Sequence, residues 1–161
     1  MRHCGDCTTK CNTKYKTCIS GTCEGYANAS IRLSWDIAGD GDLLVTTPNN
    51  VTIWRNNSGP SNMTDFGQWI YVNAKRETVV FNTTTYYRPS NGTYYICFQT
   101  SNFSMYNSTT LKRSVTATVL VQSPFQAAQT NTKLFTNTTT LFEDCNESYD
   151  SFLYKFTGYF Y

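Results

Sequence analysis

Charge and histidine are scarce in this chain, and their scarcity excludes several classes of function. Charged residues make up 15% of the 161 residues, the formal net charge is +2, and no Lys/Arg cluster is longer than a pair. An average domain has about 25% charged residues, so we expect no nucleic-acid partner and no polybasic contact with a membrane surface. The single histidine, His3, stands near the first residue, where only an ordered tail could bring it into a nucleophilic set. No pair of carboxylates is marked by its context as an acid and a base, so we expect no enzyme.

Long apolar runs are also missing. No stretch of 18 apolar residues occurs, which predicts no membrane-spanning helix. No apolar segment of the signal-peptide type follows Met1, although the asparagine pattern described next indicates secretion. We therefore expect a mature or trimmed form, whose Met1 need not be the translation start.

Asparagine, in contrast, is abundant and is placed in a telling pattern. The chain has 15 Asn, and Ser and Thr total 39, so random placement would give roughly four Asn-X-Ser/Thr acceptor sites. Ten such sites occur, at Asn28, Asn50, Asn56, Asn62, Asn82, Asn91, Asn102, Asn107, Asn137 and Asn146. This excess predicts a secreted, extracellular protein that carries many N-linked glycans, each of which is bulky and solubilising. Such a coat leaves little free surface for catalysis or for a large partner.

The rest of the composition indicates an all-β fold. Thr (26) and Tyr (12) are frequent and favour strands, whereas Asn and Ser favour turns. Alternation of apolar and polar residues is clearest in IRLSWDI and in RSVTATVLVQ, and a break is expected at SPFQAAQ. Expected strands are residues 31–37, 43–47, 51–56, 68–73, 77–82, 93–99, 113–122, 132–142 and 152–161. The pattern predicts an immunoglobulin-like antiparallel β-sandwich of 7–9 strands over residues 28–161, preceded by a small disulfide-rich appendage over residues 1–27.

Part of the sandwich resembles a family of uncharacterised domains in secreted bacterial proteins. The similarity covers about residues 31–100 and rests on a Trp-Asp strand (LSWDI), an Asp-x-Asp-Leu turn (DGDLL) and a strand entry in which Pro precedes Gly-x-Tyr (PSNGTYY). The family usually has an acidic residue where Asn73 stands, so no metal role is carried over. The resemblance implies a β-sandwich used outside the cytoplasm, and it implies no reaction.

Two sets of side chains are candidates for binding. Asp36, Asp40 and Asp42 could offer oxygen ligands to Ca²⁺. A tight hairpin turn built from Gly and Asp would account for these residues without a metal. We prefer this interpretation because the spacing is not that of an EF-hand loop. Aromatic side chains could stack on sugars, although core packing is the more general explanation; the candidates are Tyr26, Trp54, Trp69, Tyr71, Tyr86, Tyr87 and Tyr106.

The seven cysteines could bind a metal or form disulfides. Five lie in the N-terminal segment 4–26, which we call the head: Cys4, Cys7, Cys11, Cys18 and Cys23. Their spacing does not repeat a zinc-ligand pair, and secretion favours disulfides. Four of them share one stripe of a helix, but the composition is poor for a helix. If the head is helical, most of its cysteines cannot pair with each other and must bond to cysteines outside the stripe. If the head is irregular, two disulfides can close inside it.

The two remaining cysteines have different expected roles. Cys97 alternates with core positions and is predicted to be a buried, unpaired thiol. Cys145 lies near a loop and is predicted to pair with the head. Since seven is odd, one thiol is left for another chain or stays free.

These features lead to two hypotheses of function. In the first, the chain is a structural subunit of a glycan-coated fibre, filament or coat. It would assemble with copies of itself through a terminal segment, in the way that donor-strand fibre subunits do, and the aromatic residues 152–161 would be an adhesive edge if unpaired. In the second, it is an adhesin or receptor module that recognises glycan or protein, with Ca²⁺ as a conceivable aid; a viral surface glycoprotein domain is a third alternative. No other cofactor is expected.

Overall fold

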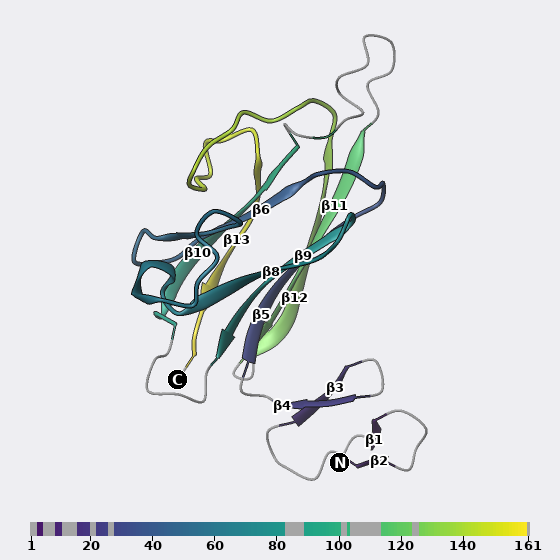
Figure 1. Cartoon of the computed structure of the whole chain (residues 1–161), viewed down its shortest axis with the longest axis vertical. Helices are drawn as coiled ribbons and strands as arrows, with labels where there is room; N and C mark the ends of the chain where they lie inside the picture. Colours follow the sequence, from purple (N-terminus) through teal and green to yellow (C-terminus); the bar gives the residue numbers. More distant parts are fainter. Residues whose placement is uncertain are drawn as a thin grey trace.

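The structure of the chain is a computed structural model. It describes the backbone of residues 3–4, 9–10, 16–19, 22–25, 28–82, 89–100, 103, 114–123 and 126–160, with side chains from Ala29 onward except that of Asn82. In this part of the chain, two larger antiparallel sheets contain all strands after residue 27 (Figure 1). The predicted all-β class is confirmed, and the nine strands of these two sheets agree with the predicted 7–9.

One sheet has five strands and the other has four. The five-stranded sheet has the order β12-β11-β5-β9-β8, with bounds Gln126–Phe135, Val115–Ser123, Asn28–Trp35, Arg76–Asn82 and Gly67–Asn73. The four-stranded sheet has the order β13-β10-β6-β7, with bounds Phe152–Gly158, Gly92–Gln99, Asp42–Thr46 and Thr52–Ile53. A short 3-10 helix, η1 (Asn62–Thr64), lies between β7 and β8.

Alternation in the sequence places one set of side chains between the sheets. In β11, Val115, Ala117, Val119 and Val121 are buried, as predicted. Side chains from both sheets form a single core with them, including Leu33, Val45, Ile96 and Phe156. Because the side chains of a strand point alternately to its two faces, the neighbours of these residues lie on the outer faces of the sandwich.

Two local predictions were wrong, and one open question is answered. The strand expected at 132–142 is β12, which begins at Gln126 and ends at Phe135, because it forms a hairpin with β11 that pairs Ser123 with Gln126 and Val115 with Phe135. Residues 38–41 are not a hairpin turn, since β5 and β6 belong to different sheets. For the head, helical and irregular structure were both left open, and its described residues form short strands: β1 (His3–Cys4) pairs with β2 (Thr9–Lys10), and β3 (Lys16–Ile19) pairs with β4 (Thr22–Gly25).

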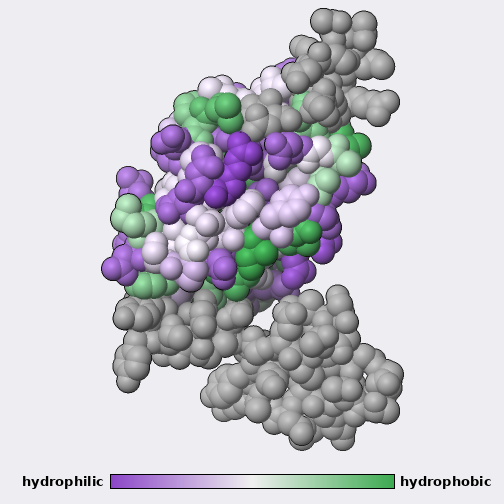
Figure 2. Space-filling model, viewed as in Figure 1, coloured by the Kyte–Doolittle hydropathy of each residue, from purple (hydrophilic) through white to green (hydrophobic). Residues whose placement is uncertain are grey.

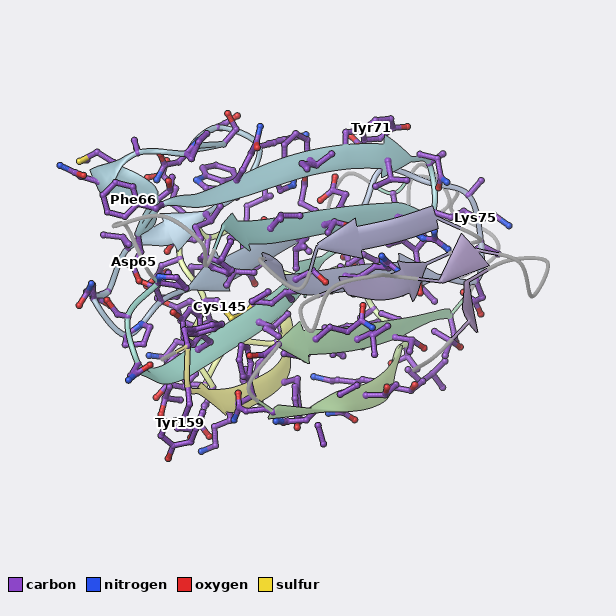
Figure 3. All side chains as sticks on the ribbon, turned by 90° about the horizontal axis from the view of Figure 1, so that it is seen from below. Asp65, Phe66, Tyr71, Lys75, Cys145 and Tyr159 are labelled. Carbon is purple, nitrogen blue, oxygen red and sulfur yellow. A yellow bond between two sulfur atoms is a disulfide. The ribbon has the colours of Figure 1, made fainter. Side chains whose placement is uncertain are left out.

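Segment 136–151 covers the outer face of the four-stranded sheet. A disulfide joins Cys145 in this segment to Cys97 in β10 (Figure 3), and both are buried beside Leu44. The backbone N–H of Cys145 donates to Thr46 Oγ1 of β6, at 2.8 Å. The prediction of a free thiol at Cys97 and of a bridge from Cys145 to the head was therefore wrong, although Cys97 is buried as expected.

The C-terminal strand is not an unpaired adhesive edge. β13 pairs with β10 from Gly158 to Phe152. Its other edge is covered by side chains of β12: Gln126 Nε2 donates to the carbonyl of Thr157 at 2.8 Å, and Lys133 Nζ donates to that of Phe152. Donation of this strand to a neighbour would break bonds within the chain, so the structure gives that route no support.

Asp65 holds the loop that precedes β8. It has a left-handed backbone, with φ of 47°, and its carboxylate accepts hydrogen bonds from Asn49 Nδ2 and from the N–H and hydroxyl of Ser90. Figure 3 shows Asp65 at the opposite end of the β8–β9 hairpin from Tyr71 and Lys75.

Replacing Asp65 tests this loop anchor. Asp65→Ala is expected to lower the free energy of unfolding by about 2 kcal/mol, because it removes charge-assisted hydrogen bonds and places alanine in a left-handed conformation. Asp65→Asn is the matched control, since asparagine tolerates this conformation and keeps one acceptor oxygen. Urea unfolding measures both, and equal losses in the two variants would contradict the assignment.

Candidate functional site

The outer face of the five-stranded sheet is the broad strand surface that segment 136–151 does not cover. Arg32 lies near its centre, opposite Leu120 of β11 on one side and Thr78 of β9 on the other. Thr130 and Ile70 continue this row onto the edge strands β12 and β8. The other outward positions hold Ser, Thr and Gln together with apolar residues, among them the exposed Leu134 of β12, so the face is mixed in polarity.

Glycosylation sites are distributed unevenly around this face. Six acceptor asparagines have described side chains, and all lie outside the strands, Asn62 in η1 and the others in loops or in segment 136–151: Asn50, Asn56, Asn62, Asn91, Asn137 and Asn146. Five of these are exposed, and the half-buried Asn91 accepts a hydrogen bond from the N–H of Phe160. Asn28 and Asn82 lie opposite each other at one end of the β5–β9 strand pair. Asn102 and Asn107 lie outside the described residues.

It follows that strands β8, β11 and β12 and the rest of β5 and β9 have no acceptor site. The outer face beyond Asn28 and Asn82 is therefore free of attached glycan even if every acceptor is used. On the side of the molecule drawn in Figure 2, hydrophobic residues form small groups among hydrophilic ones.

Cysteine pairing has a consequence for the head. Once Cys97 and Cys145 are bonded to each other, the five cysteines of the head are an odd number, so at least one of them cannot pair within residues 1–161. β3 and β4 place Cys18 opposite Cys23 in the backbone register. Cys7 and Cys11 lie outside the described residues.

The proposed calcium ligands do not converge. Asp36 Oδ1 accepts a hydrogen bond from the N–H of Thr116, at 3.0 Å. Asp40 and Asp42 instead flank Arg55, with N–O distances of 3.8 and 3.3 Å. Within the described part of the chain, no group of three or more His, Cys, Asp or Glu side chains is arranged to hold a metal ion.

Glu77 is a functional candidate that sequence reasoning did not single out. It shares the inward face of β9 with Val79 and Phe81, and it is 3% exposed. Its Oε2 accepts hydrogen bonds from the N–H of Leu43 at 2.7 Å and from Trp69 Nε1 at 3.1 Å. Burial raises the pKa of this carboxyl from 4.5 to about 7, with a smaller contribution from Asp42 and Asp40. The sequence did carry a sign of this site: in the alternating strand 77–82, the acidic Glu77 stands at a position where an apolar core residue is expected.

A hollow of about 200 Å³ opens beside Glu77. It lies between the connection from β5 to β6 and the β8–β9 hairpin, and it is lined by Trp35, Gly39, Asp40, Gly41, Tyr71, Ala74 and Glu77. Of the aromatic residues proposed to stack on sugars, Tyr71 lines this hollow and is 59% exposed. Trp54 and Trp69 are half-buried against the two hydrophobic clusters. Tyr26, Tyr86, Tyr87 and Tyr106 lie outside the described residues.

Comparison with known proteins adds no relative. No family model, no curated protein and no solved structure matches this chain. The resemblance to secreted bacterial domains therefore stays a prediction. No helix in the described residues is long and apolar enough to cross a membrane.

Proposed function

We propose that this chain is a secreted, non-enzymatic structural glycoprotein, whose copies assemble into a glycan-coated filament or coat. The sandwich would be immunoglobulin-like and the head a disulfide-rich appendage, with a boundary between residues 27 and 28. The observation that carries the proposal is the outer face of the five-stranded sheet. In the described sandwich, segment 136–151 does not cover this face, and acceptor asparagines occur on its strands only at one end, at Asn28 and Asn82.

Two features favour another copy of the chain as the partner of this face. β8, one of its two edge strands, has no charged residue between Gly67 and Asn73, so two copies can meet there without repulsion. The odd number of cysteines in the head favours a disulfide to a second chain. The head, rather than the C-terminal strand, is thus the terminal segment that supports assembly.

A glycan placed on the outer face tests the proposal. Arg32→Asn completes an Asn-X-Ser acceptor site with Leu33 and Ser34 near the centre of the face, and we expect this variant, secreted from animal cells, to lose assembly by at least tenfold. The physical reason is that a bulky glycan blocks close approach of the sheet. Light scattering and negative-stain microscopy measure assembly, and a non-reducing gel reports disulfide-linked chains.

Matched variants separate the glycan from other effects. Arg32→Asn combined with Ser34→Ala has the same asparagine without an acceptor site, and it should assemble like the parent. Lys155→Asn completes an Asn-X-Thr acceptor site with Phe156 and Thr157 on β13, on the opposite side of the sandwich, and should also assemble. A parent protein that is monomeric at every concentration, or a glycosylated Arg32→Asn variant that assembles normally, would overturn the proposal.

The hollow beside Glu77 favours the second candidate function, a binding module. An aromatic side chain, Tyr71, and a carboxylate, Asp40, meet at this hollow, which is the combination expected of a recognition pocket. A small-molecule or peptide ligand at this end of the sandwich is compatible with assembly through the sheet face.

A further inference from the structure

The hollow beside Glu77 has a lining of unusual chemistry. Two carboxylates, of Asp40 and Glu77, and two aromatic rings, of Trp35 and Tyr71, surround it, and its lining contains no basic residue. Asp40 is well exposed, with 64% of its side chain accessible, whereas Glu77 is buried. The hollow therefore combines an accessible negative charge at its rim with a second carboxyl at its floor.

The hydrogen bonds of Glu77 leave one of its oxygens available. Oε2 is held by Leu43 and Trp69. Leu43 needs this partner because β7 pairs with β6 only at Val45 and Thr46. In the described residues Oε1 accepts no hydrogen bond, so it can accept one from a ligand.

Few side-chain hydrogen-bond donors line the hollow, and the hydroxyl of Tyr71 is one of them. The indole N–H of Trp35 already donates to the carbonyl of Ala74, at 3.1 Å, and that of the adjacent Trp69 donates to Glu77. A sugar needs donors as well as acceptors, and Ca²⁺ needs six to eight oxygens. A ligand with several N–H donors and a positive charge fits both the carboxylates and the aromatic faces.

We propose that this hollow binds an organic ammonium group, such as the head of a lysine side chain or of a free alkylamine. The ammonium donates to Asp40 and to Glu77 Oε1, and its alkyl stem lies against Tyr71. Arg55 is the nearest competitor for Asp40, but its Nη1 lies 3.8 Å from Asp40 Oδ2, whereas its Nε lies 3.3 Å from Asp42 Oδ1. Arg55 is therefore held closer to Asp42 and outside the lining.

The state of Glu77 makes this binding depend on pH. Burial is the main reason that the pKa of Glu77 is raised to about 7. The acidic groups that face Glu77 are Asp40 and Asp42, and the basic group Arg55 is paired with Asp42. The carboxylate form attracts the ammonium, so binding releases a proton from Glu77. Ionisation of Glu77 rises about tenfold from pH 6 to pH 8, and affinity should rise by a similar factor.

The experiment is a titration of the whole glycosylated chain, followed by the NMR signals of the Trp35 and Trp69 indole N–H groups. Two probes distinguish the sources of the ammonium: Nα-acetyl-lysine methylamide represents a lysine side chain, and butylammonium represents a free amine. Nα-acetyl-norleucine methylamide has no ammonium and is the neutral control. We expect saturable shifts with the lysine probe, the amine probe or both, and none with the control.

Variants place the ligand in the hollow. Asp40→Asn and Tyr71→Ala should each weaken binding at least tenfold, whereas Ile70→Ala, the adjacent position on the outer face of β8, should not. Equal binding of the neutral control, affinity that does not change between pH 6 and pH 8, or full affinity in Asp40→Asn would overturn the proposal. None of these outcomes bears on assembly through the sheet face, so the two proposals fail separately.

Discussion

Replacing Cys97 and Cys145 together by alanine is expected to lower the free energy of unfolding by about 4 kcal/mol. The two residues are 48 positions apart in the sequence, and closing a loop of this length removes roughly that much conformational freedom from the unfolded chain. Part of the native packing is lost as well, since both sulfurs lie in a buried cluster with Leu44. Urea unfolding followed by tryptophan fluorescence measures the change.

The reduced parent protein provides the control. In a reductant strong enough to open the bridge, the parent and the double variant should differ by no more than about 1 kcal/mol, because only the loss of two sulfur atoms then separates them. Peptide mapping without reduction should recover Cys97 linked to Cys145. Recovery of Cys145 linked to a cysteine of the head would contradict this pairing. So would a parent and a double variant that unfold at the same urea concentration when no reductant is present.

This bridge also explains why segment 136–151 stays on the four-stranded sheet. The segment contains no strand, so side-chain and backbone groups must attach it. Thr139 and Thr100 exchange two hydrogen bonds, each hydroxyl accepting from the other's N–H, and Gln99 Nε2 donates to the carbonyl of Phe142. Loss of the disulfide should therefore leave hydrogen bonds such as these to attach the segment.

Alternation in the sequence predicted most of the strands, because burial on one face of a sheet leaves a period of two that is visible in any single chain. The positions of Ile31, Leu33 and Trp35 in β5 and the bounds of β8 and β9 are examples. The start of β12 was missed, because QAAQTNTK has few apolar residues to mark it. This edge strand packs through the polar side chains of Gln126, Asn131 and Lys133 onto β13.

The candidate sites were predicted less well than the strands, because they depend on residues that only the fold brings together. A disulfide depends on the distance between two Cβ atoms, which a spacing of 48 residues does not reveal. Acceptor asparagines are visible in the sequence, but the face that they leave clear appears only when the strands are placed side by side. Glu77 was one carboxylate among several, and only the sheet places it beneath Leu43 and beside Trp69.

Replacing Glu77 by glutamine is expected to raise the free energy of unfolding at pH 8 by about 3 kcal/mol. Glu77 has its pKa raised to about 7 in the folded protein and has the ordinary value of 4.5 in the unfolded chain. Between these values the unfolded chain releases the proton while the folded protein keeps it. Stability of the parent should therefore fall as pH rises from about 5 to 7, and level off above that.

Glutamine removes the ionisation and keeps the contacts. Its carbonyl oxygen can accept from Leu43 and Trp69 as Oε2 does, and its amide can donate toward the hollow and Asp40. Urea unfolding at pH 5 and pH 8 should show a stability difference in the parent and little difference in Glu77→Gln, while the Glu143→Gln control should behave like the parent. If the parent is equally stable at both pH values, or if Glu77→Gln is less stable than the parent at pH 8, Glu77 is not held in a site that disfavours its charge.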